Sequence, residues 1–318
     1  MHPYLSLDPV RFGLPCSLLH QSTHSPRLPQ FISTTSLHLR LTPTSVSDSL
    51  PSATLRHPIT HHLRNSRRRL VTSAPAAMFP ENLLAADICA LAISGGVATF
   101  FLLLWAQTAK RGIFDQKLNR KLVHISIGLA FMLCWPLFSS GYQGALLASL
   151  VPGLNIVRML LLGLGIMKDE GTVKSMSRYN DHRELLKGPL YYAVAVTLAC
   201  VVYYRTSPVA IAIICNLCAG DGLADIVGRR FGAQKLPYNR NKSIAGSVAM
   251  ASAGFLSSIG YMYYFSKFGY VDKSWVMVLG FLVVSLASAL VESLPISTEL
   301  DDNLTVPLTT ILVGSFIF

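Results

Sequence analysis

The sequence predicts an all-α membrane protein: a polytopic bundle of seven to eight transmembrane helices that follows a disordered transit peptide. Three observations support this prediction. Hydrophobic residues make up 51% of the chain and charged residues only 14%, whereas an ordinary soluble domain has about 25% charged residues. From Leu83 onward, long apolar stretches alternate with short polar loops. The segment before them, residues 1–77, has a different composition from the rest of the chain.

Residues 1–77 are typical of an organellar transit peptide. They contain twelve Ser, eight Thr and eight Arg but no Lys and no Glu, and transit peptides are rich in Ser and Arg and poor in acids. A secretory signal would need an uninterrupted apolar core, which this segment lacks. An ordinary disordered tail is the alternative. We expect 1–77 to be a chloroplast transit peptide and 78–318 to be the membrane domain.

The apolar stretches give the expected membrane spans in order. A helix needs about 20 apolar residues to cross a bilayer, and two of the stretches fall short of that length, which sets the range at seven to eight. No internal repeat and no amphipathic strand is evident. The expected spans are 83–106, 122–141, 143–167, 189–204, 208–226, 245–265, 275–294 and a short last one, 304–318.

The loops between these spans differ in charge from one side of the membrane to the other. Alternation places three basic loops, 107–121, 168–188 and 227–244, on one face together with the acidic loop 295–303. The positive-inside rule assigns this face to the stroma. Basic side chains can also anchor a protein to anionic lipid headgroups, and we assign most of 107–121, including Arg111, to that role. The net charge of +11 forms no basic patch on a soluble fold, so we expect no nucleic-acid partner.

Two acidic clusters lie at the ends of apolar spans on this face. Ionisable groups at membrane depth are costly and therefore usually mark a functional site. Mg²⁺ is commonly held by a few carboxylates plus substrate phosphates, and an ammonium, hydroxyls and free backbone N–H groups at a helix start can hold phosphate. No Walker A motif and no protein-kinase motif set is present. The acidic clusters are Asp221 with Asp225 and Asp301 with Asp302, and the phosphate-binding stretch runs from Lys242 to Ser247.

Several blocks together resemble the polyprenol kinase family, in its plant phytol kinase and farnesol kinase branch. The resemblance covers about 110–318, and 110–118 resembles the farnesol kinase side more closely. It implies phosphoryl transfer from CTP to an isoprenoid alcohol such as phytol, farnesol or geranylgeraniol, in the chloroplast envelope. The product would serve phytol reuse and tocopherol synthesis, or prenol salvage. The matching blocks are 219–232, 242–247, 292–295 with 300–304, 184–190 and 120–124.

We combine the residues and the resemblance into one site. The catalytic carboxylates are Asp221, Asp225, Asp301 and Asp302, one of which accepts the proton of the alcohol. Mg²⁺ is assigned to Asp221 and Asp225 with Asp302 or Asp301. CTP is assigned to Gly220, Gly228, Arg229, Lys242, Ser243, Gly246 and Ser247. Supporting roles go to His124, Arg158, Lys187, Glu292 and Asn303.

Two other functions remain open at this point. A lipid cytidylyltransferase also joins a CTP site to a helical membrane fold, but it would release pyrophosphate and form a CDP-lipid. A transporter would place charges and broken helices near the membrane midplane, whereas the charges here gather at one face.

Overall fold

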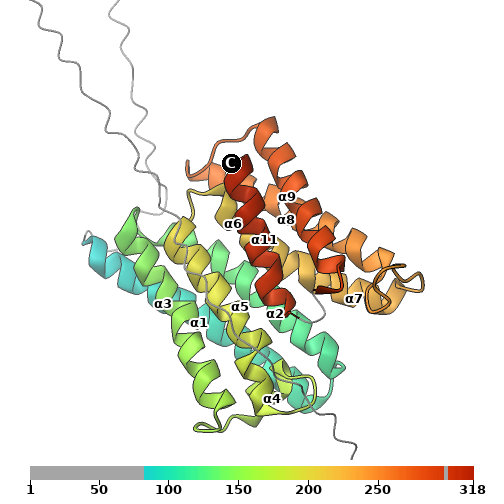
Figure 1. Ribbon diagram of the computed structural model, residues 1–318. Coiled ribbons are helices and arrows are strands. Elements are labelled where there is room, and N and C mark those ends of the chain that lie inside the picture. The colour runs from blue at the N-terminus through green and yellow to red at the C-terminus, as the bar shows by residue number, and fades with distance from the viewer. Residues whose placement is uncertain (1–81, 297–299) are drawn as a thin grey trace, which may run out of the picture. The chain divides into compact units, whose positions relative to one another are not determined.

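The computed structural model describes residues 82–296 and 300–318, and every regular element in them is a helix. The predicted all-α membrane bundle is therefore confirmed (Figure 1). The predicted transit peptide, 1–77, lies outside the described residues. The helices are α1 (Leu83–Arg111), α2 (Gln116–Leu133), α3 (Tyr142–Gly163), α4 (Glu170–Met176), α5 (Gly188–Leu198), α6 (Pro208–Ile214), α7 (Gly222–Phe231), α8 (Ile244–Lys267), α9 (Trp275–Ser293) and α11 (Asp302–Ile317).

In the described residues, four shorter helical turns extend these helices or join them. Two of them are 3₁₀ turns, η2 (Trp135–Leu137) and η3 (His182–Leu186). The other two are π-helical, η4 (Ala199–Tyr203) after α5 and η5 (Cys215–Asp221) between α6 and α7. A π-helical turn inside a longer helix is rare and is often found at a functional site.

Seven helical stretches in the described part of the chain are long and apolar enough to cross a membrane. α11, with 16 residues, is shorter, which agrees with the expected range of seven to eight. The first helix continues five residues past the predicted end of its span at 106. It ends at Gly112, whose φ of 64° is the left-handed conformation that glycine adopts readily at a helix C-terminus.

One continuous helix, formed by α6, η5 and α7, occupies the middle of the bundle. In its most apolar 18-residue segment, 83% of the residues are buried, whereas the corresponding segment of α1 is 11% buried. Its neighbours include α2, α8, α9 and α11. Residues of α6 and η5 are therefore shielded from lipid. The helix continues through α7 into the basic loop 227–244, where Arg230 and Phe231 are exposed.

Small residues bring the start of α8 against α7. A methyl group added at Gly246 would lie 3.3 Å from the Cα of Gly228 and 3.0 Å from the carbonyl oxygen of Ala224. Such close backbone approach requires glycine at the contact. The contact fixes the N-terminus of α8 beside the acidic end of the central helix.

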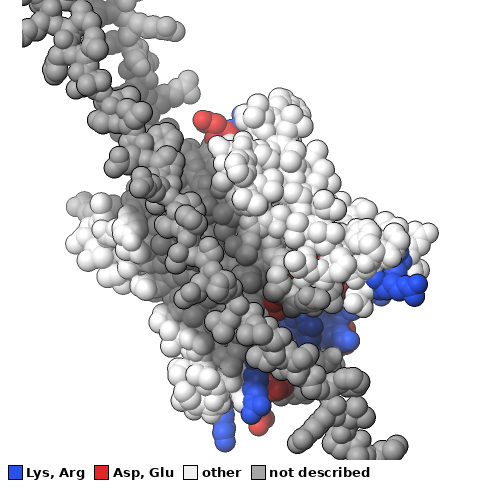
Figure 2. Space-filling view, in the orientation of Figure 1, with Lys and Arg blue, Asp and Glu red and all other residues white. Residues whose placement is uncertain are grey.

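Charged side chains lie mostly at one end of the described bundle. Figure 2 shows uncharged surface over the flanks of the helices, and most of the visible Lys, Arg, Asp and Glu lie toward the end of the bundle that carries α4 and α7 (Figure 1). This distribution suits helices whose flanks face hydrocarbon.

Candidate active site

A cavity of about 340 Å³ opens at the end of the bundle where the basic and acidic loops meet. We call it the polar cavity. Each of the four loops on the predicted stromal face reaches it, through Lys117, Arg178, Lys235 and Asp302 in turn. Its lining is Lys117, Arg120, Lys121, Arg178, Tyr179, Asp221, Ala224, Asp225, Gly228, Arg229, Lys235, Asn241, Lys242, Ser243, Gly246, Ser247, Glu292 and Asp302.

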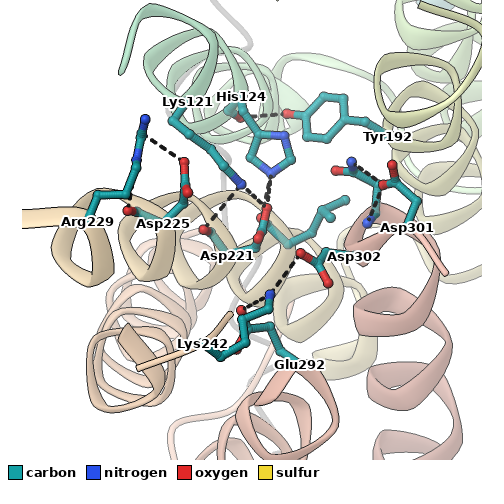
Figure 3. A network of polar contacts seen from close by, with 12 residues as sticks. Lys121, His124, Tyr192, Asp221, Asp225, Arg229, Lys242, Glu292, Asp301 and Asp302 are labelled. Carbon is teal, nitrogen blue, oxygen red and sulfur yellow. Dashed lines mark hydrogen bonds and ion pairs between the residues drawn. The ribbon is translucent and has the colours of Figure 1, made fainter. Parts of the chain in front are cut away.

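Asp221, the last residue of the π-helical turn η5, lies at the bottom of this cavity and is 2% exposed. Its Oδ2 accepts a hydrogen bond from Nζ of Lys121 at 2.8 Å and lies 3.2 Å from Nε2 of His124 (Figure 3). Nε2 also lies 2.7 Å from the carbonyl oxygen of Leu217. Because both neighbours accept hydrogen bonds, Nε2 carries the proton and donates. A buried carboxylate needs such partners, and here they fix the position of Asp221.

Three carboxyl groups from three helices meet in the polar cavity. One oxygen each of Asp221, Glu292 and Asp302 lies within 4.8 Å of the other two, and we call this group the carboxylate trio. Nζ of Lys242 contacts it, at 2.5 Å from Glu292 and 3.1 Å from Asp302. Figure 3 shows the ammonium between these two carboxylates.

The electrostatics of the trio favour a cation. Burial and the neighbouring Asp221 carboxylate raise the pKa of Asp302 to about 7, in spite of the attraction of Lys242. Burial alone would lower the pKa of Lys242, but the carboxylates of Asp302 and Glu292 outweigh it and hold that pKa above its ordinary value. Like charges this close need counter-ions to ionise together, and the ammonium groups of Lys242 and Lys121 serve that purpose here. A bound metal cation could take over the place of the Lys242 ammonium.

The donor set fits Mg²⁺. This ion prefers carboxylate oxygens about 2.0–2.1 Å away, keeps several waters and accepts substrate phosphates as ligands. Two ligands of one such ion lie at most about 4.2 Å apart, so oxygens within 4.8 Å of one another could share it after a small inward movement. Oδ1 of Asp302 is also buried without a hydrogen-bond partner among the described residues. The carboxylate trio therefore has the right chemistry for Mg²⁺. Its third member is Glu292, whereas the sequence assigned Asp225 to the metal.

The other two predicted carboxylates are placed differently. Asp225 lines the polar cavity, but its Oδ2 pairs with Nη2 of Arg229 at 2.8 Å, one turn along α7. Asp301 caps α11 by accepting hydrogen bonds from the backbone and side-chain amides of Asn303, at 3.0 and 2.6 Å. In Figure 3, Asp301 and Asp302 point to different neighbours. Neither Asp225 nor Asp301 joins the carboxylate trio.

Most of the residues assigned to CTP line the cavity. Ser243 is buried and caps α8, because its Oγ accepts from the backbone N–H of Gly246 at 3.2 Å. The Oγ of Ser247 has no hydrogen-bond partner among the described residues and can donate to a ligand. Gly220, which the sequence also assigned to CTP, is placed elsewhere. It does not line the cavity, and a methyl group there would lie 3.3 Å from the carbonyl oxygen of Met250.

The supporting residues have separate positions. Glu292 and His124 belong to the network just described. Arg158 pairs with Asp169 at 2.8 Å and does not line the polar cavity. Lys187 is exposed and does not line the polar cavity. Asn303 bonds to Asp301 beside Gly188.

The sequence assigned most of 107–121 to lipid headgroups, and for its last residues this was wrong. Lys121 is 7% exposed and paired with Asp221, and Lys117 and Arg120 line the polar cavity. The spacing of Lys121 and His124 was an available signal, because residues three apart share one helix face. Arg178, Tyr179, Lys235 and Asn241 also line the cavity without having been singled out.

Comparison with known proteins identifies the family. The chain is 63% identical over 284 residues to a chloroplastic farnesol kinase of Arabidopsis thaliana, covering 85% of this chain and 92% of that protein. The chain belongs to the plant phytol kinase and farnesol kinase family. It is also 68% identical to a probable chloroplastic phytol kinase 3 of Glycine max (76% of each chain) and 42% identical to the chloroplastic phytol kinase 1 of Arabidopsis thaliana (80% and 82%).

Family membership confirms three expectations from the sequence. The family resemblance holds over most of the chain, the family consists of alcohol-phosphorylating kinases, and its members are chloroplastic. With seven helices that could span a bilayer among the described residues, this is a chloroplast membrane enzyme. No family model and no solved structure matches the chain.

Proposed function

We propose that this enzyme transfers the γ-phosphoryl group of CTP to the hydroxyl of an isoprenoid alcohol, with farnesol as the preferred acceptor over geranylgeraniol and phytol. The observation that carries the proposal is the carboxylate trio facing basic side chains in one cavity at the membrane surface. The choice of farnesol follows the relative named farnesol kinase, at 63% identity against 42% for phytol kinase 1. The 68% identity to a probable phytol kinase keeps phytol as the alternative acceptor.

The nucleotide would bind in the polar cavity. Its volume of about 340 Å³ lies within the usual range of ligand pockets, about 300–1,000 Å³. Arg120, Arg178 and Arg229 offer positive charge to a triphosphate, and the start of α8 with the Ser247 hydroxyl offers donors to phosphate oxygens. Lys242 would exchange its two carboxylate partners for a phosphate when a metal ion takes its place.

Phosphoryl transfer needs mainly positioning and neutralisation of charge. The chemistry that bound Mg²⁺ would supply is charge neutralisation on the phosphate oxygens, with Asp221, Glu292 and Asp302 as its ligands. The alcohol oxygen forms a bond to the γ-phosphorus, the bond from that phosphorus to the bridging oxygen breaks, and CDP leaves. The alcohol proton passes to a carboxylate of the trio. His124 and Lys121 hold Asp221 in place throughout.

The membrane setting suits such a substrate pair, since lipid supplies the apolar alcohol and the stroma supplies CTP. We place the enzyme in the chloroplast envelope. Its product would enter prenol salvage or, with phytol as acceptor, tocopherol synthesis.

Product analysis tests the proposal. Membranes containing the full chain would be given labelled CTP, ATP, UTP or GTP, Mg²⁺, and farnesol, geranylgeraniol or phytol. We expect CDP and a prenyl monophosphate, fastest with CTP and farnesol, and no product after EDTA. Pyrophosphate and a CDP-linked lipid would instead establish a cytidylyltransferase. Absence of any nucleotide turnover under all conditions would refute the proposed reaction.

A further inference from the structure

A second cavity, of about 210 Å³, lies among α1, α2, α3 and α5 within the membrane-spanning part of the bundle. We call it the apolar cavity. It reaches the lipid-facing surface beside Leu154, a lining residue that is 66% exposed. Small and apolar side chains make up most of its lining, among them Gly95, Ala98, Leu102, Gly128, Phe131 and Ala193.

A smaller cavity of about 60 Å³ lies between the apolar cavity and the polar one and shares lining residues with both. We call it the connecting cavity. It shares Ile127, Asn155 and Tyr192 with the apolar cavity, and Arg120 and Lys121 with the polar cavity. The three cavities therefore follow one another from the lipid to the carboxylate trio.

Three residues that line the connecting cavity carry polar atoms whose hydrogen-bonding capacity is unused within the described part of the chain. Nε of Arg120 and the Oδ1 atoms of Asn155 and Asn303 are buried and have no hydrogen-bond partner among the described residues. Leaving such groups unpaired in the folded protein is unfavourable, so a ligand that pairs with them would be stabilised. One donor and two acceptors in a small space match a hydroxyl group, which both donates and accepts.

The connecting cavity also reaches the carboxylate trio. His124 lines it, and its Nε2 lies 3.2 Å from the Asp221 carboxylate that faces the polar cavity. Figure 3 shows His124 between Tyr192 and Asp221. A hydroxyl in the connecting cavity would thus lie next to the place proposed for the phosphate chain.

We propose that the apolar cavity binds the isoprenoid tail of the acceptor alcohol and that the connecting cavity binds its hydroxyl, with Asn155 as the residue that selects an alcohol. This inference rests on the proposed function for the identity of the ligand. The tail enters from the lipid beside Leu154, and the part of a longer chain that exceeds the cavity stays in the bilayer. The phosphoryl donor reaches the same hydroxyl from the opposite end.

Gly95 and Gly96 provide a matched pair of variants. A methyl group added at either position meets nothing within 4 Å, so both tolerate a side chain. Gly95 lines the apolar cavity, whereas Gly96 is exposed and does not. Gly95→Leu should raise KM for farnesol about tenfold or more while KM for CTP stays unchanged. Gly96→Leu should alter neither constant. Equal KM values for farnesol in both variants would overturn the proposal.

A binding measurement separates this inference from the catalytic proposal. A farnesol analogue with a photoreactive diazirine on its tail would be cross-linked to the full chain in membranes, without nucleotide, and mapped by mass spectrometry. We expect labelling on α1 and α3 that excess farnesol suppresses and that Gly95→Leu and Asn155→Leu weaken. Labelling confined to α8 and α9 would overturn the inference even if kinase activity is present. Labelling on α1 and α3 in a protein without kinase activity would support the tail site while refuting the proposed reaction.

Discussion

Nζ of Lys121 on α2 lies 2.8 Å from Oδ2 of Asp221 on the central helix, and both side chains are buried. This ion pair joins two helices at the bottom of the polar cavity. Removing one partner of a buried pair leaves an uncompensated charge, which costs about 3–5 kcal/mol. The pair therefore has consequences for both stability and activity.

Lys121→Met tests this role. We expect a clear fall in Tm of the detergent-solubilised protein and loss of kinase activity, because Asp221 loses its strongest counter-charge. Arg111→Gln is the control, since Arg111 is exposed and does not line the polar cavity. A Lys121→Met protein with the Tm and turnover of the unchanged protein would show that the pair is dispensable.

The carboxylate trio should act as one unit. Asp302→Asn and Glu292→Gln should each reduce the rate about a hundredfold and raise the Mg²⁺ concentration needed for half-maximal activity. The double variant should be little worse than either single one, because residues that act together are not additive. Initial rates across a Mg²⁺ titration measure this.

Glu170→Gln serves as the comparison for that series, since Glu170 is an exposed carboxylate on α4. Its Mg²⁺ titration should match that of the unchanged protein. If the Asp302 and Glu292 losses multiply, the two groups work independently and do not share an ion.

Gly232→Ala should destabilise the end of the central helix. The added methyl group would lie 2.1 Å from the carbonyl oxygen of Gly228 and 2.4 Å from Oγ of Ser243, so the backbone and the cap of α8 must shift. Overpacking of this kind costs about 1–3 kcal/mol, which thermal unfolding in detergent would detect. Gly260→Ala in α8 meets nothing within 4 Å and should leave Tm unchanged or slightly raised. Equal Tm values for the two variants would contradict the packing described here.

Residues 1–77 should direct a soluble reporter to chloroplasts, because their Arg and Ser content without Glu is typical of a transit peptide. Confocal imaging and protease protection of isolated chloroplasts would check this. A reporter that remains in the cytosol would contradict it, and a fusion carrying the Arg67–Arg69 cluster replaced by Ala would test the basic residues separately.

The sequence predicted the helices better than the site. Hydropathy located every span because lipid exposure requires long apolar segments, and loop charge placed four distant loops on one face. The sequence could not show which way each side chain of the site points. Asp301 and Asp302 are adjacent and chemically identical, yet only the local cap geometry of α11 directs one to Asn303 and the other into the cavity. From the sequence, Glu292 received only a supporting role and Lys121 was not singled out, because their partners, Lys242 and Asp221, lie far away in the sequence.

The central helix has one more consequence, which concerns the bilayer itself. Membranes differ in thickness, and helices that contact acyl chains adapt to that difference by tilting. The stretch Pro208–Phe231 is 83% buried over its most apolar window, so it has little contact with acyl chains and meets such changes only through its neighbours. Asp221 therefore lies on the helix whose position depends least on lipid composition among the described spans. The helices around the apolar cavity can still adjust their tilt to the bilayer.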